Sequence, residues 1–465
     1  MRVRCLRTSD TSTIVQFVPE DSAGSIPDFT GEVDQITIRY REEKTLVYCG
    51  IGPAKECTAS FLRSASARAA RAVLKLKRDI LACRVPELSL DSHTVEQAII
   101  EGILLGGYQF DKYRSEKNHK LKQLELISGT LTPSQLKKVT TICESVNYAR
   151  DLVNDNASTV TPAYLVNEAK KLSRSDRCTV TILDSKTLQK KKLNLINAVG
   201  GGSATPPALI ILEYSGAPRK KQKTAIVGKG VTFDSGGQNL KPTGSIETMR
   251  EDMAGAAAVL GVISACCRIR PAINVAGVIP AVHNAIGSHT YFPGDIYTSY
   301  SGKTVEIWST DAEGRLILAD AIAYSIAAVK PSRIIDCATL TGGVLSALGE
   351  LVAGLFSNDD DLAEDLFDAG EATGERLWRF PIYKEYRDSL KGDLGDLRNL
   401  SRFKKGFASS IIGAAFIQEF VGTLPWAHLD IAGTAFNDGS IRGEVPQFGT
   451  GFGVRLLLKY LGVTI

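Results

Sequence analysis

Residues 227 to 252 read VGKGVTFDSGGQNLKPTGSIETMRED, and residues 310 to 315, further along the chain, read TDAEGR. The two stretches combine glycines and apolar residues with two lysines and four carboxylates: Lys229, Lys241, Asp234, Asp252, Asp311 and Glu313. A loop that only turns the chain does not need this mixture. An apolar strand candidate precedes each stretch, and an alanine-rich helix candidate follows it. Strands that alternate with such helices predict an α/β domain.

The same alternation extends over the C-terminal two thirds of the chain. Strand candidates lie at Thr179–Leu183, Ala208–Leu212, Thr224–Val227, Ile273–Val278, Thr304–Ile307, Ile334–Cys337 and Trp426–Asp430. Helix candidates lie between them at Glu251–Cys267, Gly314–Val329 and Ser409–Phe420. Several strands are continuous apolar runs, which are typical of a central sheet covered on both faces. We therefore predict a large domain over residues 156–465, with a central mixed sheet flanked by helices.

Residues 1–131 carry shorter β-branched runs and two helix candidates, Ala65–Arg78 and Val95–Leu105. This pattern predicts a smaller N-terminal α/β domain. The pair Thr132-Pro133 is typical of a helix start, and a helical pattern continues from it to about Val153. We predict that residues 132–155 form a helix that connects the two domains.

The composition argues against several classes of protein. The 465 residues include 55 Lys and Arg and 51 Asp and Glu, and the net charge of +4 is too small to indicate nucleic acid or an anionic membrane as a partner. Nine scattered cysteines without a C-x-x-C pair indicate reduced thiols. The N-terminal residues do not form a secretory signal, and the longest apolar run, Gly255–Cys267, is too short to span a bilayer. We therefore expect a cytoplasmic protein that does not enter a membrane.

Common catalytic motifs are missing from the sequence. Gly302-Lys303-Thr304 matches the end of a P-loop, but Tyr297 stands where that motif requires its leading glycine. The sequence contains neither G-x-S-x-G nor H-E-x-x-H. Five histidines offer little material for a histidine-based zinc site, and a core position is the usual interpretation for His428 on its strand candidate. The remaining candidates for a catalytic site are the carboxylates of the two stretches quoted first.

Each carboxylate alone has a purely structural interpretation. Asp234 precedes Ser-Gly-Gly and fits an Asx turn, and Asp252 starts a helix, where a negative charge is favourable. Thr310 to Glu313 fits a capping box, but that interpretation leaves Asp311 unexplained, and also Arg315 in the first turn. Four carboxylates at the starts of elements favour a metal site at the edge where strands lead into helices.

The acidic ligand set suits divalent cations such as Mn²⁺, Mg²⁺ or Zn²⁺, and two such ions about 3.5–4 Å apart catalyse hydrolysis in many enzymes. Lys229 can join a metal's ligands only as the neutral amine, which requires a pKa far below its usual value of about 10.4. A lysine near four acids is more often a counter-ion. The residues alone leave both roles open for Lys229.

Three segments resemble signature sequences of the leucyl aminopeptidase family: VGKGVTFDSGG at 227–237, MREDMAGAAAV at 249–259 and TDAEGRLILADA at 310–321. Supporting segments such as Trp426–Gly433 extend the resemblance over nearly the whole chain. The resemblance implies a hydrolase that removes N-terminal residues, often leucine, from peptides with a free N-terminus. It also implies a cytoplasmic homohexamer with two divalent metal ions per subunit, namely Zn²⁺ or Mn²⁺, with Co²⁺ and Mg²⁺ as alternatives.

The resemblance also implies roles for individual residues. One metal ion would be held by Lys229, Asp234, Asp252 and Glu313, and the other by Asp234, Asp311 and Glu313, with the Asp311 backbone carbonyl added. Lys241 matches the lysine that polarises the scissile carbonyl. Arg315 matches the arginine that holds a bicarbonate ion, the general base toward the metal-bridging water or hydroxide, with help from the Leu340 backbone. The expected substrate-binding residues are Met249, Thr339, Leu340, Gly342 and Ala432.

A few positions depart from the family pattern. Ser309 stands in place of the usual asparagine, His283 in place of glutamate, and Phe292 in place of a common arginine. These departures concern substrate preference rather than hydrolysis. Two alternatives are a regulatory or DNA-binding role and a catalytically inactive structural paralogue. The basic runs at 190–192 and 219–223 are short, and the set of ligands is intact, so neither alternative is favoured.

Overall fold

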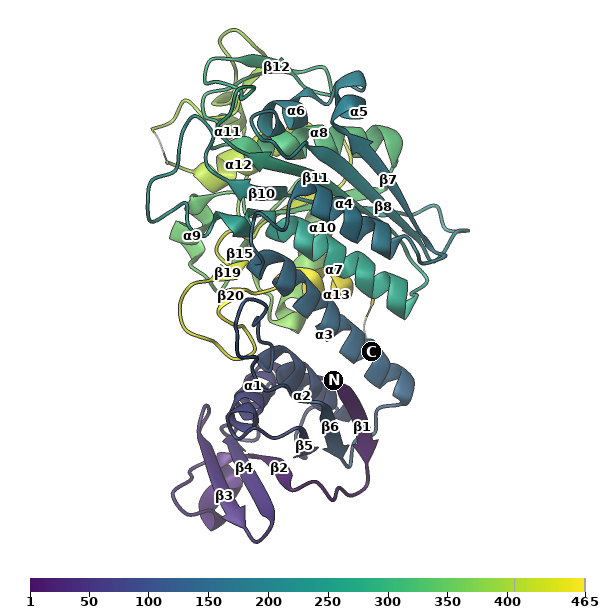
Figure 1. Cartoon of the computed structure of the whole chain (residues 1–465), viewed down its shortest axis with the longest axis vertical. Coiled ribbons are helices and arrows are strands. Elements are labelled where there is room, and N and C mark those ends of the chain that lie inside the picture. The colour runs from purple at the N-terminus through teal and green to yellow at the C-terminus, as the bar shows by residue number, and fades with distance from the viewer. Residues whose placement is uncertain (405, 464–465) are drawn as a thin grey trace. The chain divides into compact units, whose positions relative to one another are not determined.

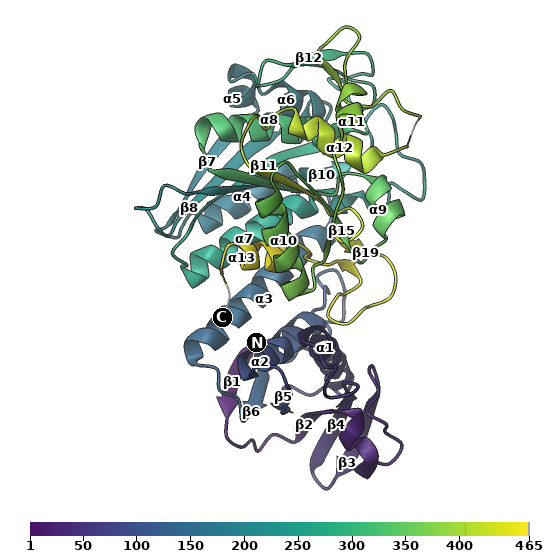
Figure 2. The same ribbon diagram turned by 180° about the vertical axis from the view of Figure 1, so that it is seen from behind.

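The structure is a computed structural model that describes residues 1–404 and 406–463, and these residues form two compact units. The N-terminal unit comprises Met1–Asn147 and Asn437–Phe448. The C-terminal unit comprises Tyr148–Phe436 and Gly449–Val463. Figures 1 and 2 show the elements of both units from opposite sides.

The N-terminal unit contains a six-stranded sheet in the order β1-β6-β5-β2-β4-β3, in which β3 runs antiparallel to β4 and the other pairs are parallel. The strands are β1 (Arg2–Leu6), β2 (Thr13–Val18), β3 (Ile36–Arg41), β4 (Lys44–Gly50), β5 (Ile80–Arg84) and β6 (Gln123–Ile127). A short 3-10 helix, η1 (Glu20–Ser25), follows β2. Helices α1 (Ala59–Lys75) and α2 (Ser92–Gly106) pack against each other. The predicted small α/β domain is confirmed.

Helix α3 (Pro133–Asn154) runs from the N-terminal unit into the C-terminal unit. It begins after Thr132, whose hydroxyl accepts a hydrogen bond from the Gln135 amide at 3.3 Å. This is the helix start that the sequence predicts. The division between the units falls inside the helix, after Asn147, and the domain limits at residues 131 and 155 stay a prediction.

The C-terminal unit contains a nine-stranded mixed sheet in the order β16-β15-β18-β14-β9-β11-β8-β7, with β10 also paired to β11. The strands are β7 (Cys178–Asp184), β8 (Ala208–Ser215), β9 (Thr224–Gly228), β10 (Gly230–Asp234), β11 (Asn274–Asn284), β14 (Arg333–Ala338), β15 (Ala353–Ser357), β16 (Leu377–Arg379) and β18 (Trp426–Asp430). The central strands β18-β14-β9-β11 are parallel, and β15 and β8 join them antiparallel. The predicted mixed sheet is confirmed.

Helices cover both faces of this sheet, which explains why its central strands are apolar on both sides. One face carries α4 (Pro162–Leu172), α7 (Ala254–Ile269), α10 (Asp360–Thr373) and α13 (Val454–Tyr460), and the other carries α6 (Asn194–Gly200), α8 (Glu313–Ala328) and α12 (Ser409–Gln418) (Figures 1 and 2). The remaining elements are η2 (Met249–Met253), α5 (Ser185–Lys190), α9 (Gly342–Leu348), α11 (Lys384–Asp388), β19 (Phe436–Asn437) and β20 (Phe448–Gly449).

One predicted strand lies outside the central sheet. The run Thr304–Ile307 forms β13 (Thr304–Glu306), which belongs to a three-stranded sheet with β12 (Ile296–Thr298) and β17 (Leu397–Arg398). The side chains of Thr304 and Glu306 bind the loop that precedes β17, because the Thr304 hydroxyl donates to Asp396 at 2.9 Å and Glu306 accepts the amide of Asp393 at 2.6 Å. Val305, between Thr304 and Glu306, is buried in the apolar core of this unit.

Helix α7 is an element of the core. Together with η2 it forms the stretch Met249–Ile269, which has the length and apolarity of a membrane span, yet 78% of that stretch's most apolar 18-residue window is buried within the protein. Its first turn lies directly on the sheet. The Ala256 amide donates to the Lys229 carbonyl at 2.9 Å, and a Cβ at Gly255 would lie 2.1 Å from the Cys337 carbonyl oxygen. Only glycine permits this approach.

We predict that Gly255→Ala destabilises the C-terminal unit by about 2–3 kcal/mol, because either α7 or β14 must move to admit the methyl group. Thermal unfolding should show a fall in Tm of at least about 5 °C. Gly24→Ala is the control, since nothing lies within 4 Å of a Cβ at Gly24. An equal Tm for wild type and Gly255→Ala would contradict this account of the packing.

Candidate metal centre

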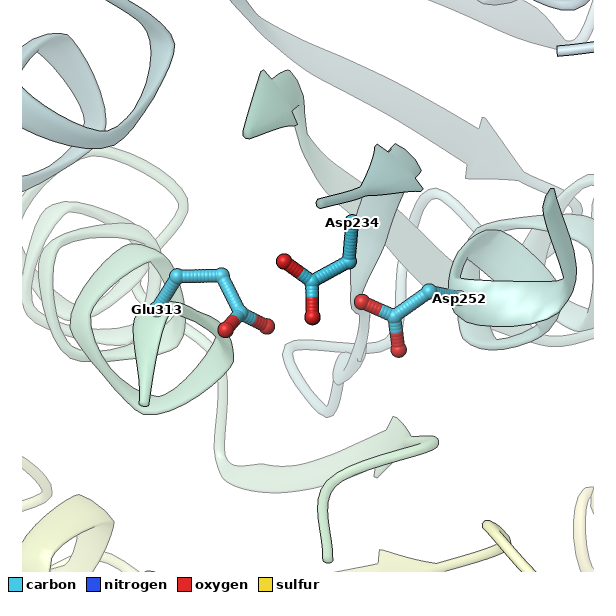
Figure 3. Close-up of side chains that lie close together, drawn as sticks. All are labelled: Asp234, Asp252 and Glu313. Carbon is cyan, nitrogen blue, oxygen red and sulfur yellow. The ribbon is translucent and has the colours of Figure 1, made fainter. Parts of the chain in front are cut away.

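Three carboxylates meet at the end of the sheet where strands lead into helices. Asp234 ends β10, Asp252 lies in η2, and Glu313 is the first residue of α8. Figure 3 shows the three side chains pointing toward one another. One oxygen atom of each lies within 4.8 Å of the others, and the residues are 2%, 4% and 2% exposed. The sequence predicted this convergence, and the oxygens lie close enough together to share one ion.

Lys229 follows β9 and directs its ammonium group into the cluster. Its Nζ lies 2.7 Å from Asp252 Oδ1 and 2.9 Å from Glu313 Oε1, and it donates to the Thr339 carbonyl oxygen at 2.7 Å. These contacts use all three protons of the ammonium group. In this structure Lys229 is therefore a counter-ion, which is one of the two roles that the sequence left open.

Lys241 and Asp311 lie on the more exposed side of the cluster. Lys241 Nζ lies 2.9 Å from Asp234 Oδ2 and 2.6 Å from Asp311 Oδ1. The Asp311 side chain is 39% exposed, in contrast to the three buried carboxylates. Lys241 thus connects a buried acid to one that solvent, and a substrate, can reach.

The loop after β10 fixes the direction of the Asp234 carboxylate. Asp234 Oδ1 accepts the Gly236 amide at 2.8 Å, which is the Asx turn considered from the sequence. Gly236 has φ +85°, and a Cβ there would lie 2.4 Å from the Asn239 carbonyl oxygen. The turn and the metal-binding role do not exclude each other, because the turn occupies one oxygen and directs the carboxylate into the cluster.

If all four carboxylates are ionised, they exceed the two ammonium groups by two negative charges. Burial raises the pKa of Asp234 to about 6, and it raises the pKa of Asp252 well above its usual value. Burial alone would lower the pKa of Lys229 and of Lys241, but the surrounding carboxylates raise both. The raised pKa values show that ionising these buried acids together is costly, and a divalent cation would favour the ionised forms.

Two oxygens of the cluster have no hydrogen-bond partner in the part of the chain that the structure describes. They are Asp252 Oδ2 and Glu313 Oε2, and both are buried. An unpaired buried acceptor costs roughly 1–3 kcal/mol. Hard divalent cations bind such oxygens well. The residues present therefore fit a metal site.

Arg315 lies in the first turn of α8 and is 5% exposed. Its Nη1 donates to the Asn399 carbonyl oxygen at 2.9 Å, while its Nε has no partner among residues 1–404 and 406–463. Burial lowers the pKa of Arg315 to about 10, so the guanidinium stays charged at neutral pH. A buried cation with an unused donor suits a small anion.

The expected substrate-binding residues lie in segments beside the cluster. The Thr339 hydroxyl donates to Asp252 Oδ1 at 2.8 Å. The amides of Leu340 and Ala432 both donate to Asp430, at 3.1 and 3.3 Å, which joins their two segments. Met249 begins η2, three residues before Asp252, and Gly342 begins α9. The Leu340 amide expected to help hold an anion is thus already donated to a carboxylate.

The sequence did not assign several residues that organise the site. Asn284 Nδ2 donates to Asp234 Oδ1 at 2.7 Å and to the Thr310 carbonyl at 3.0 Å, and the Tyr291 hydroxyl donates to the same carbonyl at 2.8 Å. Asn284 lies on β11 beside β10, so a correct pairing of these two strands was the signal needed to find it. Asp430, at the end of β18, is a third such residue.

The capping-box interpretation of Thr310 is wrong. The N-cap of α8 is Ala312, without a side-chain cap. The Thr310 hydroxyl instead donates to the Gly236 carbonyl at 2.6 Å and accepts the Asn239 amide at 2.9 Å. Because these bonds tie the segment of Asp311 and Glu313 to the loop of Asp234 and Lys241, Thr310 serves the site rather than the helix end.

Comparisons with known proteins place the whole chain among peptidases. A family model described as "Cytosol aminopeptidase family, catalytic domain" matches residues 147–458, and "Cytosol aminopeptidase family, N-terminal domain" matches residues 23–117. A probable cytosol aminopeptidase of Protochlamydia amoebophila is 42% identical over 95% of this chain and 90% of its own length. One of Chlamydia trachomatis serovar D is 42% identical over 91% of this chain and 86% of its own length.

Two solved enzyme structures are similar to this chain in both fold and sequence. The bottromycin maturation enzyme BotP, in a complex with Mn, superimposes with a TM-score of 0.89 at 32% identity, over 97% of this chain and 98% of that one. A variant of tomato leucine aminopeptidase superimposes with a TM-score of 0.90 at 32% identity, over 99% of this chain and 96% of that one.

We predict that Gly314→Ala impairs catalysis without unfolding the protein. A Cβ at Gly314 would lie 2.7 Å from Lys229 Cε and 2.8 Å from Nζ, so the lysine must leave its position between Asp252 and Glu313. We expect kcat/KM to fall about 10- to 100-fold, since displacement by about 1 Å has effects of this size. Steady-state kinetics and Tm should be measured together. Wild-type kinetics in the variant would show that Lys229 does not need this position.

Proposed function

The chain belongs to the cytosol aminopeptidase family and is a metal-dependent aminopeptidase, and on this premise we propose that its cluster of four carboxylates and two lysines is the catalytic centre. One observation carries the proposal: Asp234, Asp252 and Glu313 converge in a buried site where two of their oxygens have no partner among the described residues. A structural cluster would satisfy these oxygens with protein donors.

We propose two divalent metal ions per subunit. Asp252 and Lys229 would serve the first, Asp311 would serve the second with its side chain and its backbone carbonyl, and Asp234 and Glu313 would serve both. Zn²⁺ and Mn²⁺ are the favoured ions, with Co²⁺ and Mg²⁺ as alternatives, and the Mn complex of the similar enzyme BotP supports manganese. When bound, such ions lower the pKa of water to generate a nucleophile near neutral pH, and they polarise the carbonyl that is attacked.

Lys229 must change its protonation to become a ligand. In this structure its ammonium group donates to Asp252, Glu313 and the Thr339 carbonyl. A ligand role requires the neutral amine, which a nearby dication favours by replacing the ammonium charge. Gly314 leaves the space that the Lys229 side chain occupies, since a Cβ there would lie 2.7 Å from Lys229 Cε.

Lys241 is proposed as the group that stabilises negative charge on the scissile carbonyl oxygen. Its ammonium group lies between Asp234 and Asp311, on the exposed side of the cluster where a substrate can reach it. Once both carboxylates act as ligands, its protons are available to the substrate. A positioned cation that meets charge as it develops in the transition state contributes directly to the rate.

Arg315 is proposed to hold a bicarbonate ion, which would accept a proton from the attacking water. The buried guanidinium with an unpaired Nε supports this role. Help from the Leu340 amide would have to be shared with Asp430, which already accepts that amide at 3.1 Å.

The substrate is proposed to be a peptide with a free N-terminus and a leucine-like first residue. Met249, Thr339, Leu340, Gly342 and Ala432 would bind it. A cytoplasmic homohexamer is proposed from the family resemblance, and the names of the curated relatives support the cytoplasm. The regulatory, DNA-binding and inactive alternatives gain no support, because the proposed catalytic residues converge in one site.

Metal dependence is tested by removing the ions with a chelator and adding back Mn²⁺, Zn²⁺ or Co²⁺ singly. We expect no turnover of leucine amide before addition and recovery with at least one metal. N-acetylated leucine amide should react at least about 100-fold more slowly, because acetylation removes the free amine that the site recognises. Equal cleavage of the two substrates, or no recovery with any metal, would falsify the proposed mechanism.

The role of Asp311 is tested with Asp311→Asn. We expect kcat/KM to fall about 1000-fold or more, roughly 4 kcal/mol, with an unchanged Tm because the side chain is partly exposed. Asp388→Asn is the matched control. Asp388 is also a partly exposed aspartate between two lysines, Lys384 and Lys391, and it is not part of the cluster. Similar activity in the two variants would remove Asp311 from the catalytic set.

A further inference from the structure

Asp430 is a fully buried carboxylate that none of the roles proposed above uses. It is the last residue of β18. Its Oδ1 accepts the amides of Leu340, Thr341 and Ala432 at 3.1, 3.4 and 3.3 Å, and its Oδ2 accepts the Thr341 hydroxyl at 2.7 Å. One side chain therefore joins two segments that are about ninety residues apart in the sequence.

These two segments supply four of the five proposed substrate-binding residues: Thr339, Leu340, Gly342 and Ala432. The first segment also touches the metal centre. The Thr339 hydroxyl donates to Asp252 at 2.8 Å, and the Thr339 carbonyl accepts from Lys229 at 2.7 Å. Asp430 thus binds the segment of residues 339–342, and Thr339 in the same segment contacts the proposed metal ligands Asp252 and Lys229.

A second contact extends this arrangement to α9. Thr341 is the N-cap of α9, and its hydroxyl accepts the Val344 amide at 3.3 Å and lies 3.0 Å from the Ser410 hydroxyl. Because the same hydroxyl donates to Asp430, the carboxylate sets the direction in which α9 leaves the sheet. Gly342, the first residue of α9, takes its position from this contact.

The charge of Asp430 is balanced along β18. Residues 426, 428 and 430 share one side of the strand. His428 Nδ1 lies 2.5 Å from Asp336 Oδ1, and the Trp426 indole donates to Asp336 Oδ2 at 2.7 Å. Burial alone would lower the pKa of His428, but Asp336 and Asp430 raise it. Burial raises the pKa of Asp430, while the charge of His428 and the hydrogen bonds from Thr341, Leu340 and Ala432 lower it. An ionised acceptor binds amides more strongly than a neutral one.

A purely structural carboxylate elsewhere in this unit provides the comparison. Glu375 is buried and accepts the amides of Gly453 and Leu456 at 3.0 and 2.8 Å, where α13 begins. Both residues hold the start of a short helix through backbone amides. Of these two carboxylates, only Asp430 joins segments that carry proposed substrate-binding residues. Variants of Glu375 therefore show the effect of lost stability alone, and variants of Asp430 show any additional effect on the pocket.

We propose that Asp430 is a positioning residue for peptide hydrolysis, whose carboxylate aligns residues 339–342 and Ala432 to form the pocket for the first side chain of the substrate. The inference deepens the proposed function and rests on its assignment of these substrate-binding residues. Asp430 does not touch the reacting atoms in this account, and its effect on the rate passes through the two segments that it joins.

The consequence is measurable as a change in side-chain preference. Misalignment of the pocket should impair a leucine substrate more than an alanine substrate, because leucine depends on more contacts with the pocket wall. A loss of folded protein lowers both rates equally and leaves their ratio unchanged. The ratio of kcat/KM for leucine p-nitroanilide to that for alanine p-nitroanilide therefore distinguishes positioning from stability.

Two pairs of variants test the proposal in the metal-loaded, full-length enzyme. Asp430→Ala removes all four hydrogen bonds, and we expect the leucine-to-alanine ratio to fall about 10-fold or more, with a raised KM for the leucine substrate and unchanged metal content. Asp430→Asn keeps an oxygen for the amides but loses the charge, and we expect a fall of about 3-fold, that is, partial rescue. Glu375→Ala and Glu375→Gln should lower Tm and leave the ratio unchanged.

The results separate this proposal from the proposed function. An unchanged ratio in Asp430→Ala, or in Asp430→Asn where the alanine variant does not fold, overturns the positioning role. A fall of the ratio in the Glu375 variants as well overturns it too, because the ratio would then follow stability. Wild-type enzyme that cleaves without metal, or that ignores N-acetylation, contradicts the proposed function and leaves the measured effect of Asp430 on the ratio as a separate result.

Discussion

The site depends on one electrostatic constraint, which is that the fold buries more carboxylate than it neutralises. Asp234, Asp252 and Glu313 are almost inaccessible to solvent, and Asp311 adds a fourth acid, while the cluster contains only two lysines. Burial of unbalanced charge is costly. The cost is acceptable where divalent cations complete the site, and the two unpaired oxygens indicate where such cations belong. The metal dependence of the family thus has a visible cause in the charge arrangement of this chain.

The scaffold brings the acids together through close backbone contacts. Gly255 allows α7 to touch β14, and Gly314 leaves room for Lys229 beside the first turn of α8. Thr310 ties the segment of Asp311 and Glu313 to the loop of Asp234 and Lys241. Asp430 ties the segments after β14 and β18. The proposed metal ligands come from one group of elements and the proposed substrate pocket largely from another, and Thr339 connects them through its bond to Asp252.

Much of the fold and most of the metal site could be predicted from the sequence. The central strands are continuous apolar runs, and such runs have few alternatives to a covered sheet. The acids stood out because four of them lie at the starts of elements and because the capping-box interpretation left Asp311 and Arg315 unexplained. Prediction failed where a residue acts on a segment far away in the sequence. Asn284, Tyr291 and Asp430 bind backbone or side-chain atoms of other strands and loops, and Thr310 fitted a local capping pattern but binds the Asp234 loop instead.

The sequence by itself determined the class of fold, the family and the residues proposed to carry the chemistry, because periodicity, composition and signature segments are local properties of the chain. Only the tertiary structure decided how these residues are used. The packing of strands and helices set which carboxylates share a site, left two of their oxygens without partners among the described residues, and placed the Lys229 ammonium between Asp252 and Glu313. The same packing lets the Leu340 amide donate a hydrogen bond to Asp430. Burial and hydrogen-bond partners arise from segments brought together across the fold, so no local pattern of residues contains them.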